Sequence, residues 1–80
     1  MNFQFSKQAV KTLARLDAPT KQRLEQGITG IPQGDIKPLS GVAGTYRLRV
    51  GDWRILFSYP AAGTALVEKI APRGDVYKGI

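Results

Sequence analysis

The segment TYRLRVGDWRILF, residues 45–57, carries the clearest structural signal in this 80-residue chain. Its two halves, 45–50 and 53–57, are rich in aromatic and β-branched residues, and only Gly51 and Asp52 separate them. This pattern is typical of a tight β-hairpin, and glycine at the first central position favours a type II′ turn. Such a turn predicts three facing pairs: Val50 with Trp53, Arg49 with Arg54, and Leu48 with Ile55.

The alternation along this hairpin separates apolar from basic side chains, because successive residues of a strand point to opposite faces. The apolar set is predicted to face the core: Tyr46, Leu48, Val50, Trp53, Ile55 and Phe57. The other face then carries Arg47, Arg49 and Arg54. Guanidinium groups match phosphate oxygens, and opposed like charges destabilise a hairpin by some tenths of a kcal/mol, so this face indicates a polyanionic partner. The alternative is a solvated face with Asp52 or Asp75 as ionic partners.

The first part of the chain predicts a strand followed by a helix. Residues 2–5 alternate polar and aromatic, and Ser6 stands where a helix N-cap is expected. Helical periodicity over 7–16 predicts a buried face of Val10, Leu13 and Leu16, with Ala9 and Ala14 beside them. Lys7, Lys11 and Arg15 form a basic stripe on the opposite side, which we expect to be solvated.

A second helix is predicted to begin directly after Asp17-Ala18-Pro19, where a capping carboxylate precedes a proline. Its buried face is Leu24, Ile28 and Ile31, and Gly30 and Pro32 end it. Residues 33–45 then read as an irregular connection with Leu39 as its apolar anchor.

A last strand is predicted over 64–71, after a turn at 59–63. The order β-α-α-β-β-β predicts a compact α+β fold, in which an αα-hairpin packs on one face of a mainly antiparallel sheet. The whole chain, 1–80, is expected to be a single domain. Gly41-Val42-Ala43-Gly44 also fits the GXXG pattern of KH domains, but a KH loop joins two helices, which this order does not offer.

Composition limits the function further. Twelve Lys and Arg oppose six Asp and Glu, giving a net charge of +6, which indicates an anionic partner unless the domain is only incidentally basic. The chain has no Cys and no His, which excludes thiol nucleophiles and imidazole bases, and we expect no metal and no cofactor. No apolar run reaches the roughly 18 residues of a membrane span, so a cytoplasmic protein without membrane contact is expected.

The C-terminal stretch IAPRGDVY, residues 70–77, places Arg73 and Tyr77 close together just past the last strand. On composition alone, Tyr77 reads as ordinary edge packing. A cationic surround lowers the pKa of a phenol, however, and without histidine Tyr77 is the best candidate to take a proton from a ribose hydroxyl.

Four segments in order resemble toxins of the RelE/ParE superfamily. Residues 46–57, YRLRVGDWRILF, resemble the family core YRLRVGDYRVIY, and 72–77, PRGDVY, resemble its tail. Residues 5–13 are similar to the family's opening helix, and 37–41, KPLSG, to its KxLxG segment. Pro72 stands where many relatives have histidine, and Gly74 where they have a second arginine.

The resemblance implies a RelE-like mRNA interferase, an endoribonuclease that acts on the ribosome through the message's own 2′-hydroxyl. The absence of His and Cys and the scattered carboxylates indicate that this activity is metal-independent. By position, the resemblance implies that Arg47 and Arg49, with Lys37, grip the mRNA and that Arg54 stabilises the transition-state phosphate. Arg73 would assist the leaving group, and Tyr77 would act as base or orient it.

The same resemblance implies the partners: a cognate antitoxin whose acidic, amphipathic segment wraps the toxin, besides mRNA and the ribosome. The toxin–antitoxin complex is expected to be hetero-oligomeric and to bind operator DNA through the antitoxin. Two alternatives stay open: a ParE-type inhibitor of DNA gyrase without nuclease activity, and a plain RNA-binding module that leaves RNA intact.

Overall fold

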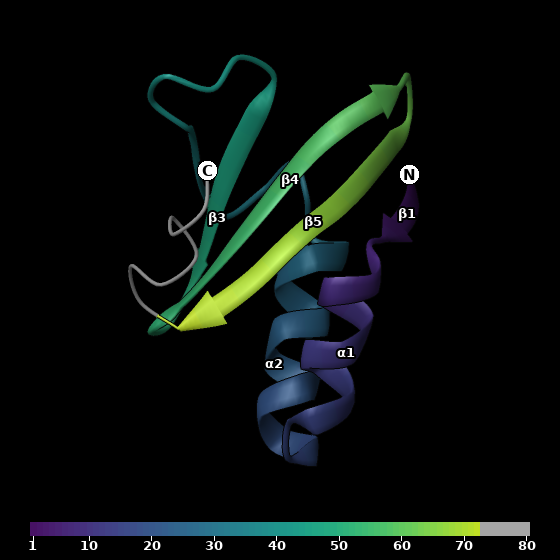
Figure 1. Ribbon diagram of the computed structural model, residues 1–80, viewed down its shortest axis with the longest axis vertical. Helices are drawn as coiled ribbons and strands as arrows, with labels where there is room; N and C mark the ends of the chain where they lie inside the picture. Colours follow the sequence, from purple (N-terminus) through teal and green to yellow (C-terminus); the bar gives the residue numbers. More distant parts are fainter. Residues whose placement is uncertain (73–80) are drawn as a thin grey trace.

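A five-stranded sheet with two helices on one face forms the protein (Figure 1). The computed structural model describes residues 1–72. The strands lie in the order β1-β5-β4-β3-β2, and β1 runs parallel to β5 while the other neighbours are antiparallel. Their bounds are β1 Asn2–Phe5, β2 Asp35–Pro38, β3 Thr45–Val50, β4 Trp53–Ala61 and β5 Thr64–Pro72. The predicted α+β class, with a mainly antiparallel sheet, is confirmed.

Both helices begin at the predicted caps. In α1, Lys7–Arg15, the Ser6 hydroxyl accepts a hydrogen bond from the Ala9 N–H at 3.1 Å. In α2, Ala18–Thr29, the Asp17 carboxylate accepts one from the Thr20 N–H at 3.2 Å. These bonds satisfy N–H groups that have no partner within a first helical turn. The two helices form the predicted αα-hairpin (Figure 1).

The core lies between this hairpin and the sheet. Leu24, Ile28 and Ile31 are buried against the sheet, as predicted. From the hairpin of strands, Leu48, Ile55 and Phe57 are buried, and Tyr46, Val50 and Trp53 pack partly buried beside them, which confirms the predicted apolar face. Burying a side chain as large as Phe57 stabilises the fold by about 1.5–3 kcal/mol.

One strand was not predicted. Residues 35–38 form β2, which pairs with β3 from Asp35↔Arg49 to Pro38↔Tyr46, so the prediction of an irregular connection over 33–45 was wrong for this segment. The element order is therefore β-α-α-β-β-β-β. The strand carries a single large apolar residue, Ile36, and ends in a proline, so its sequence lacks the pattern of a strand. Edge strands tolerate such residues because one side needs no partner.

Two further expectations need correction. Val10 was expected in the core but is 54% exposed, whereas Ala9 and Leu13 are buried. The small Ala9 allows α1 to approach the sheet, and this rotates Val10 outward. Strand β4 continues to Ala61, so the turn that leads to β5 is confined to Ala62 and Gly63 rather than spanning 59–63.

Side chains at the start of α1, from its cap Ser6 and from Gln8, continue the pairing of β5 where β1 stops. The Gln8 side-chain amide donates to the Ile70 carbonyl and accepts from the Ile70 N–H, both at 3.1 Å. The Ser6 hydroxyl donates to the Glu68 carbonyl at 2.6 Å. The exposed edge of β5 is thereby satisfied without another strand. Within residues 1–72, neither helix has the length and apolar character to cross a membrane.

Candidate nucleic-acid interface

The sheet face opposite the helices, here called the open face, collects the predicted basic residues. Arg49 lies opposite Arg54 on the neighbouring strand, in the predicted register, and Lys37 of β2 lies opposite Arg47. Directly paired residues share a face of the sheet, so Lys37, Arg47, Arg49 and Arg54 all belong to the open face. The unpredicted strand β2 is what brings Lys37 beside the arginines.

Arg47 has an ionic partner that the sequence did not indicate. Its Nη2 lies 3.4 Å from Oδ1 of Asp35, and its side chain is only 13% exposed. The two residues are diagonal neighbours on β3 and β2, so this pair depended on recognising β2. Asp52, the partner considered from the sequence, forms no ion pair within residues 1–72, and Asp75 lies outside the described residues.

Arg49 and Arg54 converge on the turn that joins their strands. The Nε of Arg49 and the Nη1 of Arg54 each donate to the Gly51 carbonyl at 3.5 Å, and Arg54 also reaches the Trp53 carbonyl at 3.4 Å. These distances are at the long limit of a hydrogen bond, so the bonds are weak. An anionic oxygen offers a shorter, charge-assisted bond and competes well for both groups. The turn itself requires glycine, because Gly51 has a φ of +59°.

The remaining predicted site residues, Arg73 and Tyr77, lie outside the described residues. The last described residues show where that segment starts: Ala71 is the strand partner of Arg54, and Pro72 is the partner of Trp53. The last described residues of β5 therefore lie beside Arg54 and Trp53.

Beside the arginines, the open face carries a small apolar cluster. Leu56 and Ala71 are buried there, and Leu39 packs against them, which confirms Leu39 as the anchor of its loop. A hollow of about 260 Å³ adjoins this cluster, lined by Leu39, Val42, Thr45, Leu56, Glu68 and Lys69. The hollow combines apolar side chains with the charged Glu68 and Lys69, and Leu56 in its wall is the strand partner of Arg47, so it suits a ligand with both apolar and charged parts.

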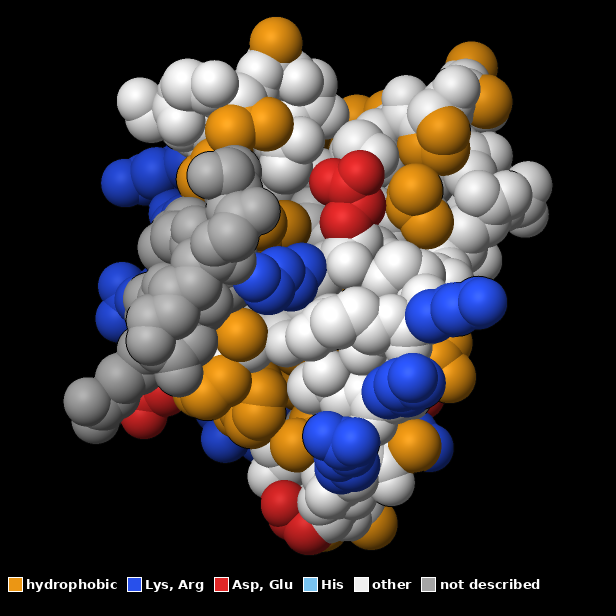
Figure 2. All heavy atoms as spheres, viewed as in Figure 1, with side chains coloured by type: hydrophobic (Ala, Val, Ile, Leu, Met, Phe, Trp, Pro, Cys, Tyr) orange, Lys and Arg blue, Asp and Glu red, His pale blue; other side chains and the backbone are white. Residues whose placement is uncertain are grey.

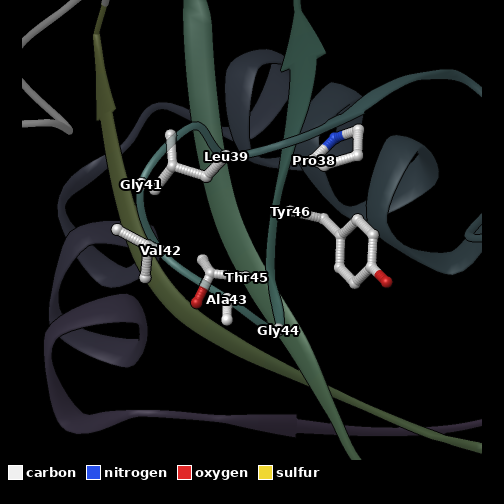
Figure 3. A pocket seen from close by; sticks show the side chains of 8 residues that line it. All are labelled: Pro38, Leu39, Gly41, Val42, Ala43, Gly44, Thr45 and Tyr46. Carbon is white, nitrogen blue, oxygen red and sulfur yellow. The ribbon is translucent and has the colours of Figure 1, made fainter.

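The loop between β2 and β3 encloses a second hollow of about 420 Å³ (Figure 3). Pro38 and Tyr46 lie on one side of β3, whereas Leu39 and Val42 lie on the other (Figure 3). Among the described residues that line this hollow, none is charged. The glycines of the GXXG pattern sit in this strand-to-strand loop and not between helices, which removes the KH alternative.

Basic side chains also gather away from the open face. Figure 2 shows Lys and Arg side chains in a column over α1, where Lys7, Lys11 and Arg15 are exposed, as predicted for the basic stripe. Within residues 1–72, no three His, Cys, Asp or Glu side chains cluster in a way that could hold a metal ion.

Several solved structures that this chain resembles are toxin–antitoxin complexes. One is the RelB–RelE antitoxin–toxin complex of Methanococcus jannaschii, with a TM-score of 0.73 and 25% identity over 92% of this chain and 94% of that chain. Another is the RelE–RelB complex of Pyrococcus horikoshii, with a TM-score of 0.73 and 26% identity over 92% of this chain and 96% of that chain. A third is the RelBE2 complex of Mycobacterium tuberculosis, with a TM-score of 0.74 and 23% identity over 90% and 96% of the two chains.

By sequence, neither a protein-family model nor a curated protein matches the chain. The structural matches define the class: this chain has the fold of the toxin subunit in toxin–antitoxin pairs. More narrowly, its fold is that of a RelE toxin, which confirms the resemblance to the RelE/ParE superfamily at the level of the fold.

Proposed function

We propose that this protein is the toxin of a type II toxin–antitoxin system and that it cleaves mRNA on the ribosome. The observation that carries the proposal is the convergence of Arg49 and Arg54 on one turn of the open face, beside Arg47 and Lys37. Phosphoryl transfer depends on preorganised positive charge around the phosphate, and fixed guanidinium groups supply it. The RelE fold of the chain supports the same function.

The reaction needs no cofactor. The ribose 2′-oxygen attacks the adjacent phosphorus, forming a 2′,3′-cyclic phosphate, while the bond from phosphorus to the 5′-oxygen breaks. The 2′-hydroxyl proton passes to Tyr77 or to a base that Tyr77 orients, and the 5′-oxygen takes up a proton with the help of Arg73. Arg54 stabilises the charge on the phosphate oxygens, while Arg47, Arg49 and Lys37 hold the message.

The proposed partner is a cognate antitoxin, as in the RelB–RelE complexes that share the fold. An acidic, amphipathic antitoxin segment that covers the open face blocks the message and neutralises a basic surface. The proposal includes a hetero-oligomeric complex that binds operator DNA through the antitoxin, and a cytoplasmic location, where ribosomes and messages are.

The proposal is tested by primer extension on a defined message in a purified translation system. We expect ribosome-dependent cuts with wild type and at least a hundredfold slower cutting with Arg54→Ala, because an oxyanion-stabilising group contributes about 10²–10³-fold. Tyr77→Phe is expected to slow cutting as well. Lys11→Ala, which removes an equal charge from the exposed stripe of α1, is the matched control and should cut like wild type.

Gyrase inhibition is the competing function, and the same preparation tests it. An intact message at high protein concentration, together with loss of supercoiling in a gyrase reaction, would replace the nuclease with a ParE-type inhibitor. Binding to RNA without either effect would reduce the protein to an RNA-binding module.

A further inference from the structure

Helix α2 brings one more arginine to the turn where Arg49 and Arg54 meet. A Cβ placed on Gly51 would lie 2.9 Å from Nη2 of Arg23 and 3.8 Å from its Cζ. Arg23 therefore rests against the same residue whose carbonyl accepts hydrogen bonds from the other two arginines. It reaches the turn from the helix side of the sheet, whereas Arg49 and Arg54 reach it from the open face.

The packing of α2 explains how Arg23 arrives there. Gly27 lies one helical turn further along, on the same side of α2, and a Cβ on Gly27 would lie 2.7 Å from Cγ2 of Val50. The absence of a side chain at Gly27 lets α2 approach the end of β3. The side chain of Arg23, one turn earlier in α2, then extends over Gly51, the residue that follows Val50.

Three guanidinium groups meet at this turn against one carboxylate, that of Asp52, which forms no ion pair within residues 1–72. The only ion pair within residues 1–72 joins Arg47 to Asp35, so Arg23, Arg49 and Arg54 have no carboxylate within 4 Å there. Guanidinium groups that converge on one residue repel one another, and an anion between them lowers that cost. When RNA binds to this surface, the phosphodiester oxygens of its backbone supply such an anion.

We propose that Arg23 is an RNA-binding residue and that it holds a backbone phosphate of the message at the Gly51 turn, beside the phosphate bound by Arg54. The inference rests on the proposed function, because the ligand is the same message. It extends the RNA path from the open face around the end of the β3–β4 hairpin toward α2.

The experiment measures binding of an oligonucleotide with a 2′-O-methyl group at every position, which cannot be cleaved, by fluorescence anisotropy over a series of salt concentrations. We expect the slope of log affinity against log salt to fall by about 0.7 in Arg23→Gln, the value for one phosphate contact on a single strand. Arg23→Lys should keep most of that slope. Lys21→Gln, an exposed residue of the same helix with the same charge loss, should leave the slope unchanged.

Equal slopes in Arg23→Gln and Lys21→Gln would overturn the inference, whether both fall or neither does, and so would a wild type that does not bind at any salt concentration. A measurement without substitution guards against misfolding: the Nε–H resonance of Arg23 in the wild type should shift when the oligonucleotide is added, and an unmoved resonance counts against the contact. Message cleavage by wild type is measured separately, so a failed nuclease and a failed Arg23 contact are distinguishable.

Discussion

Arg47 differs from the other arginines of the open face because it is mostly buried and ion-paired. Its partner Asp35 is 47% exposed, and their 3.4 Å contact lies at the rim of the sheet. Because the Asp35 side of the pair is open to solvent, the pair is worth only about 0–1 kcal/mol and does little for stability. It fixes the direction of the Arg47 guanidinium and lowers the positive potential of the face.

Asp35→Asn separates these two effects. We expect the free energy of unfolding to change by less than about 1 kcal/mol, measured by urea denaturation. The affinity for the uncleavable oligonucleotide should rise, because a negative charge beside the phosphate path is removed. Glu25→Gln on the exposed side of α2 is the control for net charge, and an equal gain in both variants would show that Asp35 has no local role.

Asp17 gives the protein a pH-dependent cap. Hydrogen bonds from the side chain and the backbone N–H of Thr20 hold the pKa of the Asp17 carboxyl below its ordinary value of 3.8. A carboxyl with a lower pKa in the folded state stabilises the fold above its unfolded pKa, and this contribution is lost as the pH falls through the folded pKa.

Asp17→Asn should therefore be less stable than wild type at pH 7, and the gap between the two should close below about pH 3.8. Urea unfolding of both proteins from pH 7 to pH 2.5 measures that gap, and the other carboxyls cancel because both proteins contain them. A gap that is constant over this range would contradict the role of the Asp17 charge.

At the scale of elements, the contact between α2 and β3 depends on Gly27. Alanine normally stabilises a helix by about 1 kcal/mol over glycine, but a Cβ here would lie 2.7 Å from Val50. We expect Gly27→Ala to destabilise the protein by about 1–2 kcal/mol, because overpacking outweighs helix propensity.

Thermal and urea unfolding measure this change. Gly30→Ala is the matched control, since a Cβ there would have no neighbour closer than 3.4 Å and the residue has an αR conformation. Greater stability of Gly27→Ala than of wild type would mean that α2 does not lie against Val50 as described.

The edge of β5 depends on the hydrogen bonds that the Gln8 side chain makes with the backbone of Ile70. Gln8→Ala removes both hydrogen bonds to the backbone of Ile70, and we expect a loss of about 1–2 kcal/mol because partly buried backbone groups lose their partner. Hydrogen exchange at the Ile70 amide should accelerate as well. Gln22→Ala, the same change at an exposed site of α2, should have little effect on either quantity.

The elements that were predicted from the sequence are those fixed by local signals. The caps at Ser6 and Asp17, the Gly51 turn and the alternation of β3 each depend on neighbours within a few residues. Strand β2 is different: its pairing with β3 crosses the loop between them, and its own residues Lys37 and Pro38 favour no strand. Without β2, the pairing of Asp35 with Arg47 and the place of Lys37 on the open face could not be foreseen.

In the site as well, only the features set by residues close together in the sequence could be predicted. The register Arg49↔Arg54 followed from the two-residue turn, so the sequence alone indicated a cluster of arginines on one face. The approach of Arg23 to Gly51 depends on how α2 crosses the sheet, which is set by the close contact at Gly27. A helix–sheet approach of this kind has no signature in the periodicity of either element.

At the scale of the whole molecule, the fold separates a stabilising layer from a binding layer. The helices and the main core occupy one side of the sheet, and the other side carries Lys37, Arg47, Arg49 and Arg54 beside the small cluster around Leu56. The strand pairing fixes the spacing of the backbone positions that carry these side chains, which favours transition-state stabilisation over loose electrostatic attraction. The column of basic residues over α1 (Figure 2) lies on another part of the surface. A substitution there, such as Lys11→Ala, therefore measures the effect of losing a positive charge outside the open face.

The central claim is that the arginines of the open face promote attack by the message's own 2′-hydroxyl. The most direct test places a single 2′-deoxynucleotide immediately 5′ to the scissile phosphate of a ribosome-bound message, at the position mapped by primer extension. Wild-type protein should leave this message intact at that position, while the all-ribose message is cut and yields a 2′,3′-cyclic phosphate end. Cutting of the deoxy-substituted message at the same position and rate would contradict the account.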